Sequence, residues 1–114
     1  MMQEETRAQI AVAKYLDYRG LLFTASAAGM HTSKKQASIH KAMGVKKGTP
    51  DLLIFEPVME DGYIGTAIEM KSETGRATLE QKIWLDELKR RGWKAAICKG
   101  SKAAIDLIEK TYPQ

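Results

Sequence analysis

The chain has 114 residues, 44% of them hydrophobic, and a formal net charge of +4. A chain of this length buries roughly two thirds of its unfolded surface, so we expect one domain, residues 1–114, with a core of its own. Its apolar runs fall well short of the ~20 residues that cross a membrane, and its polar start is unlike a secretory signal. We therefore expect a cytoplasmic protein with no membrane partner.

Residues 4–19 predict the first helix. Glu5, Gln9, Val12 and Leu16 follow one another at spacings of four, three and four, so they share one stripe of this helix. Val12 and Leu16 must face a core, which turns Glu5 and Gln9 inward as well. An inward acid in the first turn can complement the helix dipole. It can equally reach a metal site, and the sequence leaves both roles open.

Residues 18–50 form a segment whose charged side chains are all basic. It contains a predicted short strand, residues 21–25, and a weak helix, residues 35–43. It carries +6, which leaves −2 for the rest of the chain. Its basic residues are Arg19, Lys34, Lys35, Lys41, Lys46 and Lys47. Such a block can be a solvated loop, but its place directly before a candidate metal site favours phosphate contacts. His31 and His40 also lie here. We expect them to be exposed to solvent or next to phosphates, and their spacing does not fit a zinc site.

Two strand-like runs come next. Gly48-Thr49-Pro50-Asp51 leads into an apolar run, and a second run ends at Ile68-Glu69-Met70-Lys71 after a turn near Gly62. Because side chains alternate along a strand, Glu69 and Lys71 point to the same face. If the two strands pair, Asp51 and Glu69 converge and Lys71 reaches in beside them.

This convergence predicts a metal site. Two carboxylates suit Mg²⁺ or Mn²⁺, and a neighbouring lysine can orient a water or neutralise charge on a phosphate. Each element also has an ordinary explanation. Glu69 and Lys71 can be a solvated ion pair, and Pro50-Asp51 can simply begin a strand. The combination favours a functional site.

The clearest helix of the chain begins after Thr78. Thr78 and Gln81 fit a capping box, with Gln81 at the third helical position. Gln81 also lies on or beside the buried stripe formed by Trp84, Leu85 and Leu88. Two ion-pair spacings, Asp86 with Arg90 and Glu87 with Arg91, mark the solvated side.

The remaining residues predict a strand and a last helix. Residues 93–99 read as a strand in which Cys98, the single cysteine, is a small buried hydrophobe. Ser101 is a plausible N-cap for a helix that runs to about Lys110. Two strands joined by a turn, then a helical crossover to another strand, predict an α/β fold: a mixed sheet with helices on its faces.

In this order, the motifs resemble the VRR-NUC domains, a branch of the restriction-endonuclease-like nucleases with a Pro-Asp…Glu-x-Lys signature. The resemblance covers nearly the whole chain, and no residue of the core signature is missing. The residues that carry it are Glu5-Thr6-Arg7-Ala8-Gln9, Met43-Gly44-Val45-Lys46-Lys47-Gly48-Thr49-Pro50-Asp51, Ile68-Glu69-Met70-Lys71, and Glu80-Gln81-Lys82-Ile83-Trp84-Leu85 followed by Gly92.

The resemblance implies a restriction-endonuclease-like fold and a set of site residues. Asp51, Glu69 and Lys71 would form the catalytic core, with Gln81 as an accessory residue. Asp51 and Glu69 would hold Mg²⁺ or Mn²⁺ with the backbone carbonyl of Met70. Glu5 would be an outer or second-metal ligand.

The resemblance also implies a function and partners. The chain would be a stand-alone homodimeric endonuclease that cuts branched DNA, including four-way junctions, because two symmetric active sites can address two symmetric strands. Lys34, Lys35, Lys41, Lys46 and Lys47 would contact DNA phosphates without reading bases. The alternatives are a DNA-binding module without catalysis and an inactive nuclease-like partner subunit.

Overall fold

The computed structural model describes residues 2–27 and 32–114, so the expectation for His31 lies outside it. The chain folds into four helices and four strands in these residues. In order they are α1 (Glu4–Arg19), β1 (Phe23–Ala25), α2 (Lys34–Ala42), β2 (Leu52–Ile54), β3 (Thr66–Lys71), α3 (Leu79–Arg90), β4 (Lys94–Lys99) and α4 (Ser101–Thr111). None of the helices is long and apolar enough to cross a membrane.

The strands form one mixed sheet in the order β1-β2-β3-β4. β1 with β2 and β2 with β3 are antiparallel, whereas β3 and β4 are parallel. The parallel pair needs a crossover, which α3 provides. The expected α/β class with a mixed sheet between helices is therefore confirmed.

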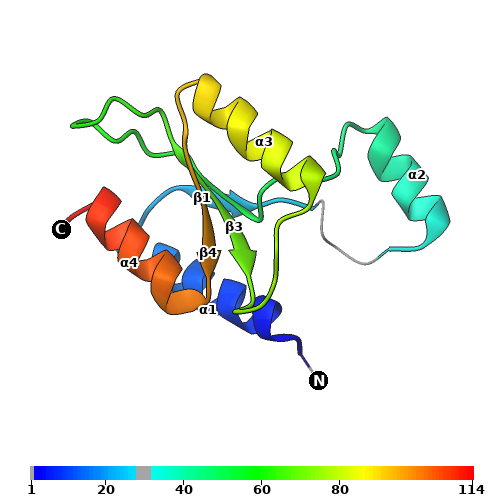
Figure 1. Ribbon diagram of the computed structural model, residues 1–114, viewed down its shortest axis with the longest axis horizontal. Helices are drawn as coiled ribbons and strands as arrows, with labels where there is room; N and C mark the ends of the chain where they lie inside the picture. Colours follow the sequence, from blue (N-terminus) through cyan, green and yellow to red (C-terminus); the bar gives the residue numbers. More distant parts are fainter. Residues whose placement is uncertain (1, 28–31) are drawn as a thin grey trace.

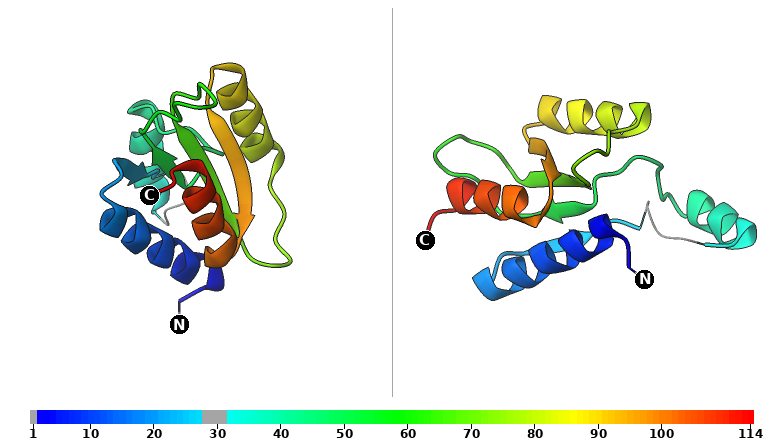
Figure 2. Two further views of the ribbon diagram at one scale, coloured as in Figure 1. Left: turned by 90° about the vertical axis from the view of Figure 1, so that its left-hand side faces the viewer. Right: turned by 60° about the horizontal axis from the view of Figure 1, so that its bottom comes forward.

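The helices lie on both faces of the sheet. α1 and α4 pack together on one face, and α3 covers β3 and β4 on the other (Figures 1 and 2). α2 stands apart from these layers, beyond the edge of the body (Figure 1). No residue of α2 is buried.

The core lies between the sheet and the α1–α4 layer. Val12 and Leu16 of α1 are fully buried, as the spacing of the first helix predicts. They pack in one cluster with the inward residues of β2, β3 and α4, which include Leu52, Ile54, Ile68, Met70, Ala104 and Ile108. Cys98 is buried and free, and burial raises the pKa of its thiol to about 11. The expectation that Cys98 is a small hydrophobe is confirmed.

Two local expectations are wrong. Ser101 is the first residue of α4 rather than its N-cap; Gly100 holds that position with φ 89°, because β4 ends only one residue earlier. Asp86 does not pair with Arg90. Glu87 lies within reach of residues three and four positions ahead, so it binds both Arg90 and Arg91, and these arginines lower the pKa of Glu87.

A buried hydroxyl network ties the end of α4 to the sheet. The Tyr112 hydroxyl donates to the Glu56 carbonyl oxygen at 2.8 Å. It also lies 2.7 Å from the hydroxyl of Thr66, which is only 1% exposed. Because the single hydroxyl hydrogen of Tyr112 is used in the bond to Glu56, the Thr66 hydroxyl must be the donor in its bond to Tyr112.

We predict that Tyr112→Phe destabilises the protein by about 1–3 kcal/mol, because it leaves the buried Thr66 hydroxyl and the Glu56 carbonyl without this partner. Urea unfolding would measure the loss. Tyr18→Phe is the matched control, since Tyr18 is 80% exposed, and should leave the free energy of unfolding unchanged. Equal stability of both variants would contradict the prediction.

Candidate active site

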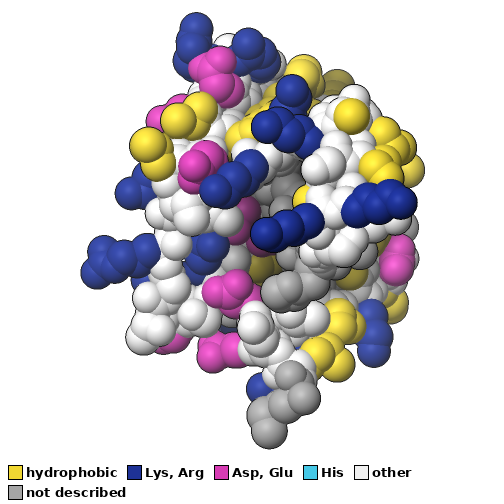
Figure 3. All heavy atoms as spheres, turned by 90° about the vertical axis from the view of Figure 1, so that its right-hand side faces the viewer, with side chains coloured by type: hydrophobic (Ala, Val, Ile, Leu, Met, Phe, Trp, Pro, Cys, Tyr) yellow, Lys and Arg dark blue, Asp and Glu magenta, His cyan; other side chains and the backbone are white. Residues whose placement is uncertain are grey.

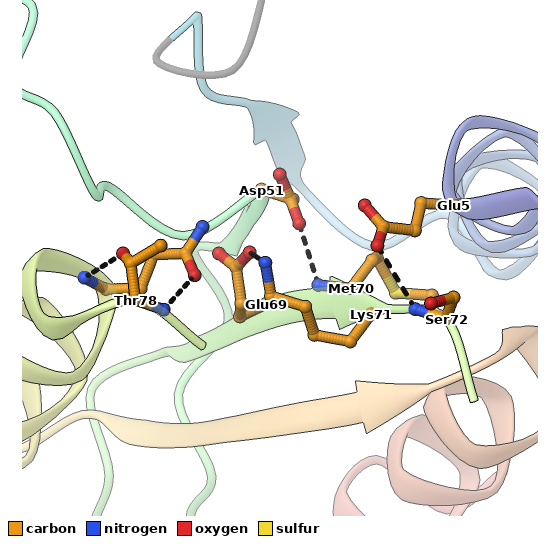
Figure 4. Close-up of polar contacts among 8 residues, drawn as sticks. Glu5, Asp51, Glu69, Met70, Lys71, Ser72 and Thr78 are labelled. Atoms are coloured by element: carbon orange, nitrogen blue, oxygen red, sulfur yellow. Dashed lines mark hydrogen bonds and ion pairs between the residues drawn. The ribbon is translucent and has the colours of Figure 1, made fainter. Parts of the chain in front are cut away.

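Strand pairing brings the two predicted carboxylates together. Leu52 of β2 pairs with Ile68 of β3 in the antiparallel register. Asp51 directly precedes Leu52 and Glu69 directly follows Ile68, so the two acids lie opposite each other across the strands. Asp51 Oδ2 accepts a hydrogen bond of 2.7 Å from the Met70 N–H, which fixes the Asp51 side chain against β3 (Figure 4).

Lys71 completes the predicted triad. It shares a face of β3 with Glu69, and its Nζ lies 3.3 Å from Glu69 Oε2. The side chains of Lys71 and Glu69 are only 11% and 3% exposed. The alternative of a solvated surface ion pair is therefore wrong: this pair is buried.

Burial perturbs both acids, and the charge of Asp51 acts further on Glu69. Burial raises the pKa of Asp51, although the Met70 N–H and the Lys71 ammonium oppose this. Burial and the nearby charge of Asp51 raise the pKa of Glu69 to about 7, again against Lys71. Asp51 and Glu69 thus lie beside Lys71, the single positive side chain among the described residues that line the site. This arrangement is typical of functional sites rather than of stabilising ion pairs.

The donor set fits a divalent cation. Glu69 Oε1 is buried and has no hydrogen-bond partner among residues 2–27 and 32–114. A buried oxygen without a partner costs stability unless a cation or a hydrogen-bond donor meets it. Asp51 and Glu69 supply the hard oxygens that Mg²⁺ and Mn²⁺ prefer. Among residues 2–27 and 32–114, however, no three His, Cys, Asp or Glu side chains form a metal-binding group. Further ligands would have to be a backbone carbonyl or water.

The triad lies in an open cleft of about 410 Å³. Figure 3 shows a hollow in this face of the molecule, with acidic side chains inside and Lys and Arg side chains around it. The cleft lies where α1, α3 and the ends of β2 and β3 meet. Its lining residues are Met2, Gln3, Glu5, Thr6, Gln9, Asp51, Glu69, Met70, Lys71 and Gln81.

Comparison with known protein families matches the VRR-NUC domain to residues 3–102. The chain belongs to the VRR-NUC family. Among solved structures, a VRR-NUC domain protein is 26% identical, with a TM-score of 0.70 over 98% of this chain and 90% of the other. Another VRR-NUC domain is 20% identical, with a TM-score of 0.65 over 97% of this chain and 99% of that one, and shows the same fold. No curated protein matches the chain.

The family confirms the resemblance drawn from the motifs and gives the chain a nuclease-like, DNA-processing character. Two further residues predicted from the sequence, Glu5 and Gln81, line the cleft. Glu5 enters from the first turn of α1, where its Oε1 accepts a hydrogen bond of 3.3 Å from the Ser72 N–H (Figure 4). This contact holds Glu5 beside the end of β3, within the cleft but outside any three-residue acidic group.

Gln81 serves the helix and lines the cleft at once. The capping box of α3 is present: Gln81 Oε1 accepts from the Thr78 N–H at 2.8 Å, and Thr78 Oγ1 accepts from the Gln81 N–H at 3.2 Å. Because the amide oxygen of Gln81 is already used, its NH₂ group is the part left for the cleft. Gln81 is therefore suited to donate a hydrogen bond rather than to bind a metal.

Gly48 brings the segment that leads to Asp51 against α3, a role that its sequence motif did not reveal. Gly48 has φ 91°, and a Cβ there would lie 2.7 Å from the backbone carbon of Glu80. Only glycine allows this approach. The neighbouring Lys47 and Glu80 add an exposed ion pair of 3.8 Å. Thr6, which belongs to the first-helix motif but received no role from the sequence, also lines the cleft.

The five predicted DNA-contacting lysines lie outside the cleft. Lys34, Lys35 and Lys41 belong to α2, which has no buried residue. Lys41, Lys46 and Lys47 line, with His40, a separate hollow of about 360 Å³. The structure thus divides the predicted residues between an acidic cleft and a basic projection beside it.

We predict that the metal-free protein becomes more stable as the pH falls from 7 toward 4.5. The folded pKa of Glu69, about 7, lies above the ordinary value of 4.5, so the folded state binds a proton that the unfolded state has lost. Glu69→Gln should be more stable than wild type at pH 8 in EDTA and should weaken this pH dependence. Thermal unfolding at several pH values measures both effects. If the Tm of wild type decreased steadily as the pH was lowered from 7 to 4.5, and the Tm of Glu69→Gln decreased in parallel, the assignment would be contradicted.

We predict that Gly48→Ala destabilises the protein by about 1–3 kcal/mol more than Gly44→Ala. Both glycines have positive φ, 91° and 103°, so both substitutions strain the backbone. Only at Gly48 does the added Cβ meet backbone, because nothing lies within 4 Å of a Cβ at Gly44. Urea unfolding of the two variants separates the clash from the strain. Equal losses would show that the contact with α3 contributes nothing.

Proposed function

We propose that the chain is a metal-dependent endodeoxyribonuclease that hydrolyses phosphodiester bonds in branched DNA. The observation that carries the proposal is the group of half-buried Asp51 with buried Glu69 and Lys71 in an open cleft, where Glu69 Oε1 has no hydrogen-bond partner among the described residues. Membership of the VRR-NUC family supports the same chemistry.

Asp51 and Glu69 are the residues that would hold Mg²⁺ or Mn²⁺, together with the backbone carbonyl of Met70. Glu5 would act from the outer side, through a water or a second ion. When bound, the cation supplies a polarised phosphate and a water of lowered pKa. The hydrogen bond from the Met70 N–H keeps Asp51 turned toward Glu69, so this chain pre-forms the carboxylate pair without an ion.

Lys71 and Gln81 provide the positive and donor groups. The Lys71 ammonium is held by Glu69 at 3.3 Å, in a place where little water competes for it. There it can stabilise charge that develops on the phosphate and align the attacking water. The NH₂ group of Gln81, fixed by the capping box, can donate to the same phosphate or water.

The basic projection supplies DNA contacts away from the chemistry. Lys34, Lys35, Lys41 and Lys46 have no acidic neighbour in the sequence between residues 18 and 50, and Lys47 is tied to Glu80 only by an exposed pair of 3.8 Å. Such exposed pairs contribute little, so Lys47 is free to exchange Glu80 for a phosphate. These contacts would favour DNA shape over base sequence.

We further propose that the active form is a cytoplasmic homodimer. One chain has one triad, and opposite strands of a symmetric four-way junction need two. This part of the proposal rests on the family resemblance and on the open cleft, which leaves the triad accessible to duplex DNA.

The competing function is a DNA-binding module, or a nuclease-like partner subunit, without catalysis. The buried acids argue against it. Two carboxyl groups with raised pKa values weaken a fold, and a protein that only grips DNA gains nothing from placing them at the floor of its cleft.

The deciding experiment compares cleavage of a synthetic four-way junction and a linear duplex with Mg²⁺, Mn²⁺ or EDTA. We predict metal-dependent, symmetric nicking of the junction. Lys71→Ala should slow it at least about 100-fold, because a preorganised charge at the phosphate is lost. Asp51→Asn should abolish metal stimulation.

Lys99→Ala is the matched control, since Lys99 pairs with Lys71 in the parallel register but is exposed on β4. It should cleave like wild type. Sedimentation of the wild-type protein tests the dimer separately. A protein that binds the junction but cuts neither substrate with either metal would replace this proposal with the binding-module alternative.

A further inference from the structure

The connection between β1 and β2 is longer than the fold requires. The two strands are antiparallel neighbours, with Ala25 paired to Leu52, and a turn of about two residues can join such strands. The chain instead uses residues 26–51. Long connections within compact domains usually have a function of their own. We call the part formed by residues 33–50 the arm.

Among the described residues, the helix of the arm has no buried side chain that anchors it to the rest of the chain. α2 is nine residues long and none of them is buried; it extends away from the sheet and from the other helices (Figures 1 and 2). A helix shorter than about 12 residues is marginal without packing. The Ser33 hydroxyl caps it by accepting from the Gln36 N–H, but its full stability must come from a partner.

The charge of the arm indicates what that partner is. α2 carries Lys34, Lys35 and Lys41, and the arm contains no acid. Helical spacing puts Lys34 and Lys41 on one side and Lys35 about 100° away. Charge on more than one side of a helix suits a partner that surrounds it with negative groups, as the two phosphate walls of a DNA groove do.

We propose that α2 enters the major groove of a duplex segment that lies beyond the catalytic cleft. The inference rests on the proposed nuclease function and adds to it a second, separate DNA contact. The major groove, about 12 Å wide, admits an α-helix, and nine residues span about 13.5 Å. Ile39 and Met43, which are 41% and 76% exposed and four residues apart, would meet apolar groups of the groove such as thymine methyls.

A second copy of the chain fits the arm less well. Two arms would repel each other, since neither contains an acid. The large exposed apolar side chains of α2 and its C-cap are Ile39 and Met43, which make a small surface for a stable protein contact. DNA, by contrast, offers phosphates to the lysines and apolar groove atoms to Ile39 and Met43 at the same time.

The proposal narrows the substrate class. No lining residue described for the cleft belongs to the arm, and α2 extends away from the other helices and the sheet (Figure 1). The DNA must therefore contain a duplex branch that continues past the scissile phosphate. Single-stranded DNA and junctions with very short duplex branches should bind weakly. They can fill the cleft, but they offer α2 no major groove.

The test measures binding in EDTA, where no cleavage occurs. The probe is a four-way junction whose duplex branches contain guanines. The N7 atoms of these guanines lie in the major groove and react with dimethyl sulphate. Wild type should protect one patch of guanine N7 atoms. The triple variant Lys34→Gln, Lys35→Gln, Lys41→Gln should lose that patch, bind at least about tenfold more weakly and show a salt slope smaller by about 2–3.

Two controls accompany it. The triple variant Lys14→Gln, Lys89→Gln, Lys110→Gln removes the same charge from exposed positions outside the arm and should keep the protected patch. Ala37→Pro removes the N–H that bonds the Ser33 carbonyl at 2.8 Å and breaks α2 with no loss of charge. It should lose the patch, whereas Ala37→Ser should keep it.

Protection that is lost in the first triple variant and in Ala37→Pro supports the proposal. The proposal would be overturned if wild type protected no patch and the variant with Lys34, Lys35 and Lys41 changed to Gln merely bound more weakly. The arm would then contact only phosphates and would not enter the groove. If the variant with Lys34, Lys35 and Lys41 changed to Gln sedimented differently from wild type but bound DNA with the same affinity, the proposal would also be overturned. The arm would then be assigned to contact with a second copy of the chain. A protected patch in a protein that cuts no DNA with Mg²⁺ or Mn²⁺ would support the arm and refute only the nuclease function.

Discussion

The structure depends on one electrostatic constraint: two carboxylates held together at the point where β2 begins and β3 nears its end. Their repulsion must be balanced within the fold. Lys71 does so from the same strand, 3.3 Å from Glu69, and the Met70 N–H does so for Asp51 at 2.7 Å. Because both partners come from β3, the carboxylate pair exists only while the β2–β3 register is intact.

Other parts of the fold secure this arrangement from outside the sheet. The bare Cα of Gly48 rests on the backbone of Glu80, so the segment that leads to Asp51 is set by the first turn of α3. The capping box of that turn fixes Gln81, and Glu5 closes the other side from α1 through Ser72. The cleft is thus assembled from the starts of two helices and the ends of two strands, all anchored in one packed body.

Much of this could be predicted from the sequence because it depends on local patterns. Alternation along β3 places Glu69 and Lys71 together, and the spacing of Thr78 and Gln81 encodes the capping box. What could not be predicted depends on choices between equivalent partners or on contacts between distant segments. Glu87 had two arginines within reach, and Gly100 took the cap from Ser101 because β4 ends beside it. The close approach of Gly48 to Glu80 joins segments far apart in the chain. The isolation of α2 is likewise a property of what is absent around it in the described structure, which no pattern within residues 34–42 records.

The base of the β1–β2 connection has an evolutionary consequence. Its ends are fixed, since Ala25 pairs with Leu52 and the Ser26 N–H donates to the Asp51 carbonyl at 2.9 Å. The separation of the ends is therefore the same whatever lies between them. The entropic cost of closing a longer loop grows only slowly with its length. This position is consequently an insertion point, at which the connecting segment can lengthen or be replaced while the register that holds Asp51 stays unchanged.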